Sequence, residues 1–236
     1  MSSILPPARP LLGLAIALSL AGCAATTASK PTAVEANVTT KAVGYLDKTA
    51  VPASIDLVPA PPAAGSAAFA LDEQVSREAR ALRGSPRFAQ ASVDAELGFP
   101  EGANHFSCAA DVDVDAVKTP ALYRLLERSR IDASAATKAA KNKYQRPRPF
   151  MVNGEPTCSP KDEEGLRSNG SYPSGHTSIG WAWALILSEI APDRADAIQA
   201  RGRNYGESRL VCNVHWQSDI LEGRFMGAAA VARLHD

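Results

Sequence analysis

The chain has 236 residues, of which 45% are hydrophobic, and this suits one domain with a sizeable core. Lysine and arginine together number 25, and so do aspartate and glutamate. No overall field therefore attracts nucleic acid or an acidic membrane surface, and we expect no nucleic-acid partner. Any preference for an anion must be local.

The first residues are typical of an export signal. Arg9 gives a short positive region, and Leu11 to Leu20 form an apolar run too short to span a bilayer comfortably. The following Leu-Ala-Gly-Cys, which ends at Cys23, resembles the lipobox of bacterial lipoproteins. The resemblance implies a signal peptide over residues 1–22 and a lipidated Cys23. Cleavage after a later alanine, giving a soluble periplasmic protein, stays open.

Ala24 after the cysteine resembles lipoproteins sorted to the outer membrane, so we expect the protein on the periplasmic face of that membrane. Residues 24–64 are rich in Ala, Thr, Pro and Val and show little helical periodicity, which indicates a flexible tether. The expected division is a signal peptide at 1–22, the lipid-anchored Cys and linker at 23–64, and a domain at 65–236.

From Leu71 onward the pattern is helical, and no alternating strand pattern competes with it. We therefore expect an all-α fold, a single compact multi-helix bundle. Six helices are predicted: from Asp72 to Gly84, from Thr119-Pro120 through Leu126, from Asp132 or Ser134 to near Pro147, from His176 to Pro192, from Asp193 to about Leu210, and from His215 to Leu234.

The central stretch Gly170 to Thr177 contains the turn formers Pro173, Ser174 and Gly175, directly before a long apolar segment. A loop that leads into a helix presents free backbone N–H groups together with the positive end of the helix dipole. This arrangement favours an anion. His176 at the junction adds a group that can carry a proton near neutral pH.

Three further cations belong to the candidate site. Lys141 and Arg148 are seven residues apart, and Pro147 and Pro149 should leave Arg148 on an extended corner. Arg209 is expected at a helix end. For each of them a solvated surface position is the ordinary alternative.

His215 and Asp219 are four residues apart, a spacing that puts both on one face of a helix. A carboxylate bonded to one ring nitrogen makes the other more basic, as in catalytic triads. His176, His215 and Asp219 could also form a two-His, one-carboxylate metal site. The three cations argue against a metal and for an oxyanion, especially a phosphoryl group.

If the chain is exported, its cysteines can form disulfides. We favour Cys158 with Cys212, because this pair would tie the loop before the central motif to the loop before His215. Spacing alone does not prove it, and Cys108 could pair with either.

Taken together, three segments match a known signature: Lys141 to Pro149, Pro173 to His176, and Ser208 to Asp219. They resemble the type 2 phosphatidic acid phosphatase superfamily, which also includes vanadium haloperoxidases. The fuller Gly-Ser-Tyr-Pro-Ser-Gly-His-Thr is similar to bacterial class A non-specific acid phosphatases. The resemblance runs from about Ala64 to the C-terminus. Relatives of this class usually continue beyond a point equivalent to Asp236, which leaves the contacts of a possible homodimer open.

This resemblance implies a bundle of the acid phosphatase type and an exported enzyme that hydrolyses small phosphate monoesters of broad range without metal or cofactor. It implies that His215 attacks phosphorus to form a phosphohistidine, with Asp219 bonded to its other nitrogen. His176 would protonate the leaving group, so activity should fall at high pH as it loses its proton. The phosphate-binding set implied is Lys141, Arg148, Ser174, Gly175 and Arg209.

Other functions could use the same phosphate-binding residues. Apyrase, phosphotransferase or vanadate-dependent haloperoxidase activity would differ in substrate rather than in the anion-binding residues. A lipoprotein that binds phosphate without turnover is a non-enzymatic alternative, but binding alone would need only the cations and not His176, His215 and Asp219.

Overall fold

A computed structural model describes residues 42–236, and this part of the chain contains helices and no strand, as predicted. The long helices are α2 (Ala67–Arg80), α6 (Pro120–Ala135), α10 (Gly175–Ile190), α11 (Ala195–Val211) and α12 (Gln217–Leu234). The shorter ones are α1 (Ser54–Leu57), α3 (Pro86–Val93), α4 (Glu101–Asn104), α5 (Ser107–Ala110), α7 (Lys138–Tyr144), α8 (Pro149–Asn153) and α9 (Glu163–Arg167), with 3₁₀ turns η1 (Pro160–Asp162) and η2 (Pro192–Arg194). Within these residues no helix is long and apolar enough to cross a membrane.

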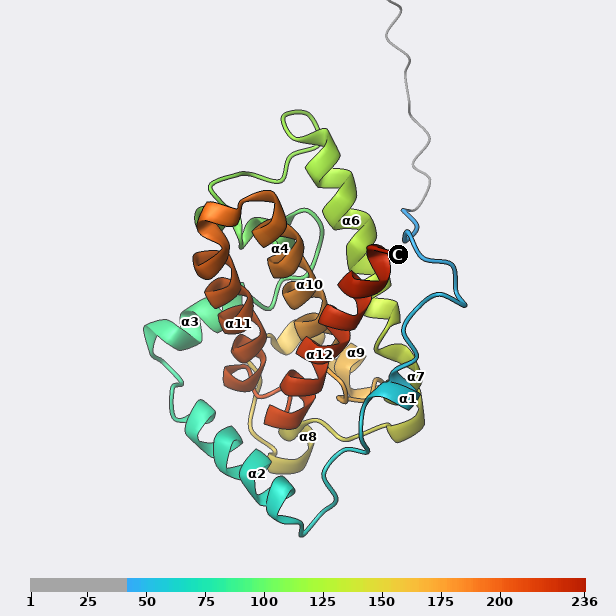
Figure 1. Cartoon of the computed structure of the whole chain (residues 1–236). Helices are drawn as coiled ribbons and strands as arrows, with labels where there is room; N and C mark the ends of the chain where they lie inside the picture. Colours follow the sequence, from blue (N-terminus) through green and yellow to red (C-terminus); the bar gives the residue numbers. More distant parts are fainter. Residues whose placement is uncertain (1–41) are drawn as a thin grey trace, which may run out of the picture. The chain divides into compact units, whose positions relative to one another are not determined.

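Helix α10 is the centre of the fold, and α6, α11 and α12 pack around it (Figure 1). Most of its residues are buried, which explains why the sequence is apolar on every side of this helix. The indole N–H of the fully buried Trp183 donates to the Leu126 carbonyl of α6 at 3.0 Å. Gly180 has no side chain at the point where Tyr205 of α11 lies against α10. The helix that carries the central motif is thus held on three sides.

Helix ends agree with the prediction where proline or a capping hydroxyl marks them. Pro120 is the first residue of α6, and Ser174 caps α10 by accepting a hydrogen bond from the Thr177 amide at 3.2 Å. The expected end of α10 before Pro192 is also confirmed.

Three predicted helix starts are wrong. Helix α2 is capped by Ser66, and Asp72 lies inside it as a buried residue. Asp132 and Ser134 belong to the last turns of α6, because α7 begins only at Lys138. In each case an Asp or Ser that could cap a helix instead bonds to a distant part of the chain or continues its own helix. Helix α12 starts at Gln217, so His215 precedes it.

Residues 42–64 were expected to belong to a flexible linker, but they pack against the helices of the domain. Ser54 is fully buried, and its hydroxyl accepts a hydrogen bond from the Ala140 amide of α7 at 3.0 Å. The Tyr45 amide donates to the Asp132 carboxylate at 2.8 Å, and the Tyr172 hydroxyl donates to the Pro59 carbonyl at 2.7 Å. The expected boundary between residues 64 and 65 thus falls inside packed structure.

Candidate active site

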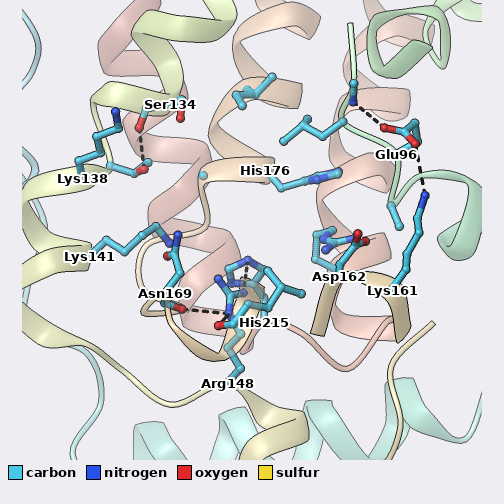
Figure 2. A pocket seen from close by; sticks show the side chains of 18 residues that line it. Glu96, Ser134, Lys138, Lys141, Arg148, Lys161, Asp162, Asn169, His176 and His215 are labelled. Carbon is cyan, nitrogen blue, oxygen red and sulfur yellow. Dashed lines mark hydrogen bonds and ion pairs between the residues drawn. The ribbon is translucent and has the colours of Figure 1, made fainter. Parts of the chain in front are cut away.

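A cavity of about 400 Å³ is lined by His176, His215, Lys141, Arg148 and Arg209, which come from three separate stretches of the chain. Gly175, the first residue of α10, also lines it. In Figure 2 the side chains of Lys141, Arg148 and His215 lie near one another, and Glu96, Lys161 and Asp162 lie at the opposite edge. The structure therefore brings together the cations and imidazoles that the sequence placed in one site.

Arg148 is fixed by backbone carbonyls. It occupies an extended position just before α8, as the flanking prolines predicted. Its Nε donates to the carbonyls of Leu166 and Asn169 at 3.0 and 3.1 Å, and its Nη1 donates to the Val214 carbonyl at 3.0 Å. Burial is the main cause that lowers the pKa of Arg148, to about 10, so it keeps its charge at neutral pH.

The tautomer of His215 follows from its two neighbours. Its Nδ1 lies 3.2 Å from Asp219 Oδ2, and its Nε2 lies 3.1 Å from Arg148 Nη1. A guanidinium can only donate, so Nε2 must be the acceptor, and Nδ1 is left to donate its proton to Asp219. Burial, and then the charges of Arg148 and Lys141, hold the pKa of His215 well below its ordinary value. Neutral His215 thus has its Nε2 lone pair on the side of the cations.

The contact between His215 and Asp219 arises differently from the prediction, because only Asp219 is helical. The loop from Cys212 to Trp216 folds back on α11, where the Arg209 carbonyl accepts hydrogen bonds from the Val214 and His215 amides at 3.2 and 3.3 Å. Asp219, in the first turn of α12, accepts the Trp216 amide at 2.8 Å and thereby fixes the loop. The turn before the helix, rather than the helix face, positions the imidazole.

Arg209 and His176 each keep a buried polar atom without a hydrogen-bond partner among residues 42–236, namely Arg209 Nε and His176 Nε2. Buried polar atoms of this kind are costly unless a ligand satisfies them. The His176 ring stacks on Tyr205, with centroids 4.5 Å apart. Burial first, and then Arg209 and His215, hold the pKa of His176 well below its ordinary value. The cavity lining contains two carboxylates, Glu96 and Asp162, against five lysine and arginine side chains, so its net charge is positive and an anion fits it.

Ser174 and Asp219 stand behind the cavity and do not line it. Ser174 was expected in the phosphate-binding set, but its amide donates to the Asp219 carbonyl at 2.9 Å and its hydroxyl oxygen caps α10. Gly175, the first residue of α10, does line the cavity, and the helix dipole favours negative charge there.

Lys141 is partly buried on α7, and its Nζ donates to the Gly170 carbonyl at 2.8 Å and more weakly to the Ser171 carbonyl at 3.4 Å. These bonds come from the central loop itself and fix the ammonium next to it. Burial, and then the charge of Arg148, lower the pKa of Lys141 to about 7.

Sequence reasoning missed two residues close to this site, Arg146 and Asp72. Arg146 bonds to Asp219 Oδ1 at 2.7 Å and to Asp72 Oδ2 at 2.7 Å. Arg146 lies within the stretch from Lys141 to Pro149, yet nothing in the stretch distinguished it from a surface arginine. Asp72 is far away in the sequence and gave no signal except that of a helix cap.

Cys158 and Cys212 form a disulfide, which is the pairing that the sequence favoured, and Cys108 is free and exposed. The disulfide holds the loop before η1 next to the end of α11, three residues beyond Arg209. Cys23 lies outside the described residues.

Comparisons with known proteins agree with this geometry. The PAP2 superfamily matches residues 130–235, which include every segment of the cavity that carries a cation or an imidazole. A solved structure titled as a transmembrane PAP2 type phosphatidylglycerolphosphate phosphatase from Bacillus subtilis is 19% identical with a TM-score of 0.48, over 73% of this chain and 86% of that chain. This partial overlap adds nothing to the assignment, which rests on sequence relatives.

The non-specific acid phosphatase of Providencia stuartii is 44% identical over 84% of this chain and 81% of its own length. That of Salmonella typhimurium is 40% identical over 75% of this chain and 71% of its own. The chain therefore belongs to the acid phosphatases of the PAP2 superfamily.

Proposed function

We propose that this acid phosphatase hydrolyses small phosphate monoesters of broad range through a phosphohistidine on His215, and that it needs no metal ion. The observation that carries the proposal is the orientation of the His215 ring. Its Nδ1 faces the Asp219 carboxylate and its Nε2 faces a donor-only guanidinium, so the available lone pair lies where the cations gather.

In the first step the Nε2 lone pair of His215 forms the bond to phosphorus while the bond to the ester oxygen breaks. Lys141, Arg148 and Arg209 bind the equatorial oxygens, over which the transition state spreads its charge. A bound phosphoryl oxygen accepts the Arg148 N–H that otherwise faces His215 Nε2. Asp219 stabilises the imidazole as positive charge develops on it.

His176 supplies the proton that the leaving alkoxide needs. Before substrate binds, burial and then the charge of Arg209 hold the pKa of His176 well below its ordinary value, so the imidazole is neutral. A bound phosphate dianion opposes those cations and raises that pKa, so the imidazole takes up its proton together with the substrate. In the second step His176 removes a proton from water, water oxygen bonds to phosphorus, and the bond from phosphorus to His215 breaks.

The cations take the place that a metal ion has in other phosphatases. A divalent ion among Lys141, Arg148 and Arg209 would meet strong like-charge repulsion in a partly buried cavity. Among residues 42–236 no three His, Cys, Asp or Glu side chains form a group that could bind one. We also propose export and lipidation at Cys23, on the strength of the leader sequence.

The test is rapid-quench trapping with radiolabelled phenyl phosphate, with and without EDTA. We expect an acid-labile phosphoenzyme in the native protein, unchanged activity in EDTA, and no phosphoenzyme in His215→Ala. His235→Ala is the matched control, because that imidazole is exposed and pairs with Glu189 on the surface. An active His215→Ala enzyme, or activity lost in EDTA and restored by Zn²⁺, would refute the mechanism. Parallel assays with ATP, and with bromide plus peroxide, test for apyrase and haloperoxidase activity at the same site.

A further inference from the structure

The guanidinium of Arg146 joins two buried carboxylates behind the cavity. Its Nη1 donates to Asp219 Oδ1 and its Nη2 to Asp72 Oδ2, each at 2.7 Å. Arg146 is 7% exposed, Asp72 2% and Asp219 0%. Arg146 does not line the cavity, so it acts on a bound phosphate only through other residues.

Asp72 holds Arg146 from the opposite side. Asp72 Oδ1 accepts the Ser218 amide at 2.8 Å, and Oδ2 accepts the Ser218 hydroxyl at 2.6 Å as well as the Arg146 bond. The same hydroxyl lies 2.7 Å from Arg146 Nη1. Helix α2 is thereby joined to the first turn of α12 through one guanidinium, and these bonds fix the orientation of the Arg146 guanidinium.

We infer that Arg146, held by Asp72, is a positioning residue that keeps the Asp219 carboxylate ionised and turned toward His215. The inference rests on the proposed role of His215 as nucleophile. Oδ1 of Asp219 is occupied by Arg146, which leaves Oδ2 to accept from His215 Nδ1 and from the Trp216 amide.

The physical reason is the burial of Asp219. Burial is the main cause that raises the pKa of this carboxyl, and Arg146 is the main cause that opposes it. The other charged or titratable groups that face it are Lys141 on α7, Arg148, His215 and, through Arg146, Asp72. A protonated Asp219 could donate to Nδ1 of His215. The imidazole would then carry its proton on Nε2 and lose the lone pair that attacks phosphorus.

The test measures kcat against pH at saturating substrate in Arg146→Gln and Arg146→Lys. Because Asp219 must be ionised, activity is present above its pKa and is lost as pH falls through it. Removing the Arg146 charge raises that pKa, so the acid limb of Arg146→Gln should move to higher pH. At acid pH we expect kcat to fall about 10- to 100-fold with little change in KM. Arg146→Lys keeps the charge but loses the fork, so it should recover only part of kcat.

Asp219→Asn separates this role from a structural one. This variant has no carboxyl at position 219 to ionise, so its kcat should stay low when the pH is raised. The double variant Arg146→Gln, Asp219→Asn should be no slower than Asp219→Asn alone, because both changes act through one group. The matched control is Arg128→Gln. Arg128 bonds to the carbonyls of Val43 and Gly44 away from the cavity, so the acid limb of the Arg128→Gln profile should stay in place.

An unshifted acid limb in Arg146→Gln, or losses that multiply in the double variant, would overturn the inference. If Arg146→Gln fails to fold, Arg146→Lys decides the question. It keeps the charge but loses the fork that joins Asp219 to Asp72, so kcat should fall while the acid limb stays near its native position; an unchanged kcat would overturn the inference. Failure of the proposed function is distinguishable, because no phosphohistidine would then form in the native enzyme.

Discussion

Lys141 should make anion binding depend on pH in a way that the other site residues do not. Burial, and then the neighbouring Arg148 charge, lower its pKa to about 7. Above that pH Lys141, one of the three cations expected to bind phosphate, loses its charge. Arg148, with a pKa of about 10, keeps its charge, and the imidazoles are already neutral because their pKa values lie well below the ordinary one.

The magnitude follows from a single titration. If the anion binds only when Lys141 is charged, the apparent dissociation constant rises by a factor of one plus the ratio of neutral to charged Lys141. Affinity should therefore fall about 2-fold at pH 7, about 10-fold at pH 8 and about 100-fold at pH 9, and each further tenfold loss corresponds to about 1.4 kcal/mol. Below about pH 6 Lys141 is fully protonated, so its titration should no longer change the affinity.

Competitive inhibition by sulfate is the assay, because sulfate keeps a constant charge across this range while phosphate does not. Lys141→Arg should make the decline shallower, since arginine stays protonated and only the proton uptake by His176 still depends on pH. Lys143→Arg is the matched control: it lies on the same helix two residues away and is exposed. A sulfate inhibition constant that does not change from about pH 6 to about pH 9 in the native enzyme, or that rises equally in Lys141→Arg, would refute the reasoning.

Gly223→Ala should lower both stability and kcat, because its Cβ would lie 2.6 Å from the Ser174 carbonyl and push α12 away from the start of α10. Gly165→Ala, which meets nothing within 4 Å, should change neither in thermal melts and assays. Replacing Cys158 and Cys212 by serine removes a crosslink across 54 residues. Chain entropy predicts a loss of about 4 kcal/mol in the free energy of unfolding, measured by denaturant titration; an unchanged midpoint would contradict it.

The sequence predicted those parts of the site that follow from local chemistry. Proline and serine marked the starts of α6 and α10, and the prolines around Arg148 fixed its extended backbone. The three segments with motif residues do meet at one cavity. In this part of the chain the residue types alone carry the information, because turns, caps and charge patterns are decided within a few residues.

The sequence could not show interactions that depend on tertiary structure. Asp72 has the ordinary signature of a helix cap, but its carboxylate bonds to Arg146, which is 74 residues away. His215 precedes α12, although its spacing from Asp219 suited a helix, because hydrogen bonds to the Arg209 carbonyl fix the loop. Nothing in the sequence indicated, either, that burial and the charge of Arg148 lower the pKa of Lys141 to about 7.

The stretch from Tyr45 to Pro59 has a consequence for how the domain completes its folding. Its hydrogen bonds to Asp132, Ala140 and Tyr172 join residues 87, 86 and 113 positions apart in the chain. During synthesis these early residues emerge from the ribosome long before their partners. They must therefore wait through the production of about half the polypeptide, and contacts of such sequence separation slow folding.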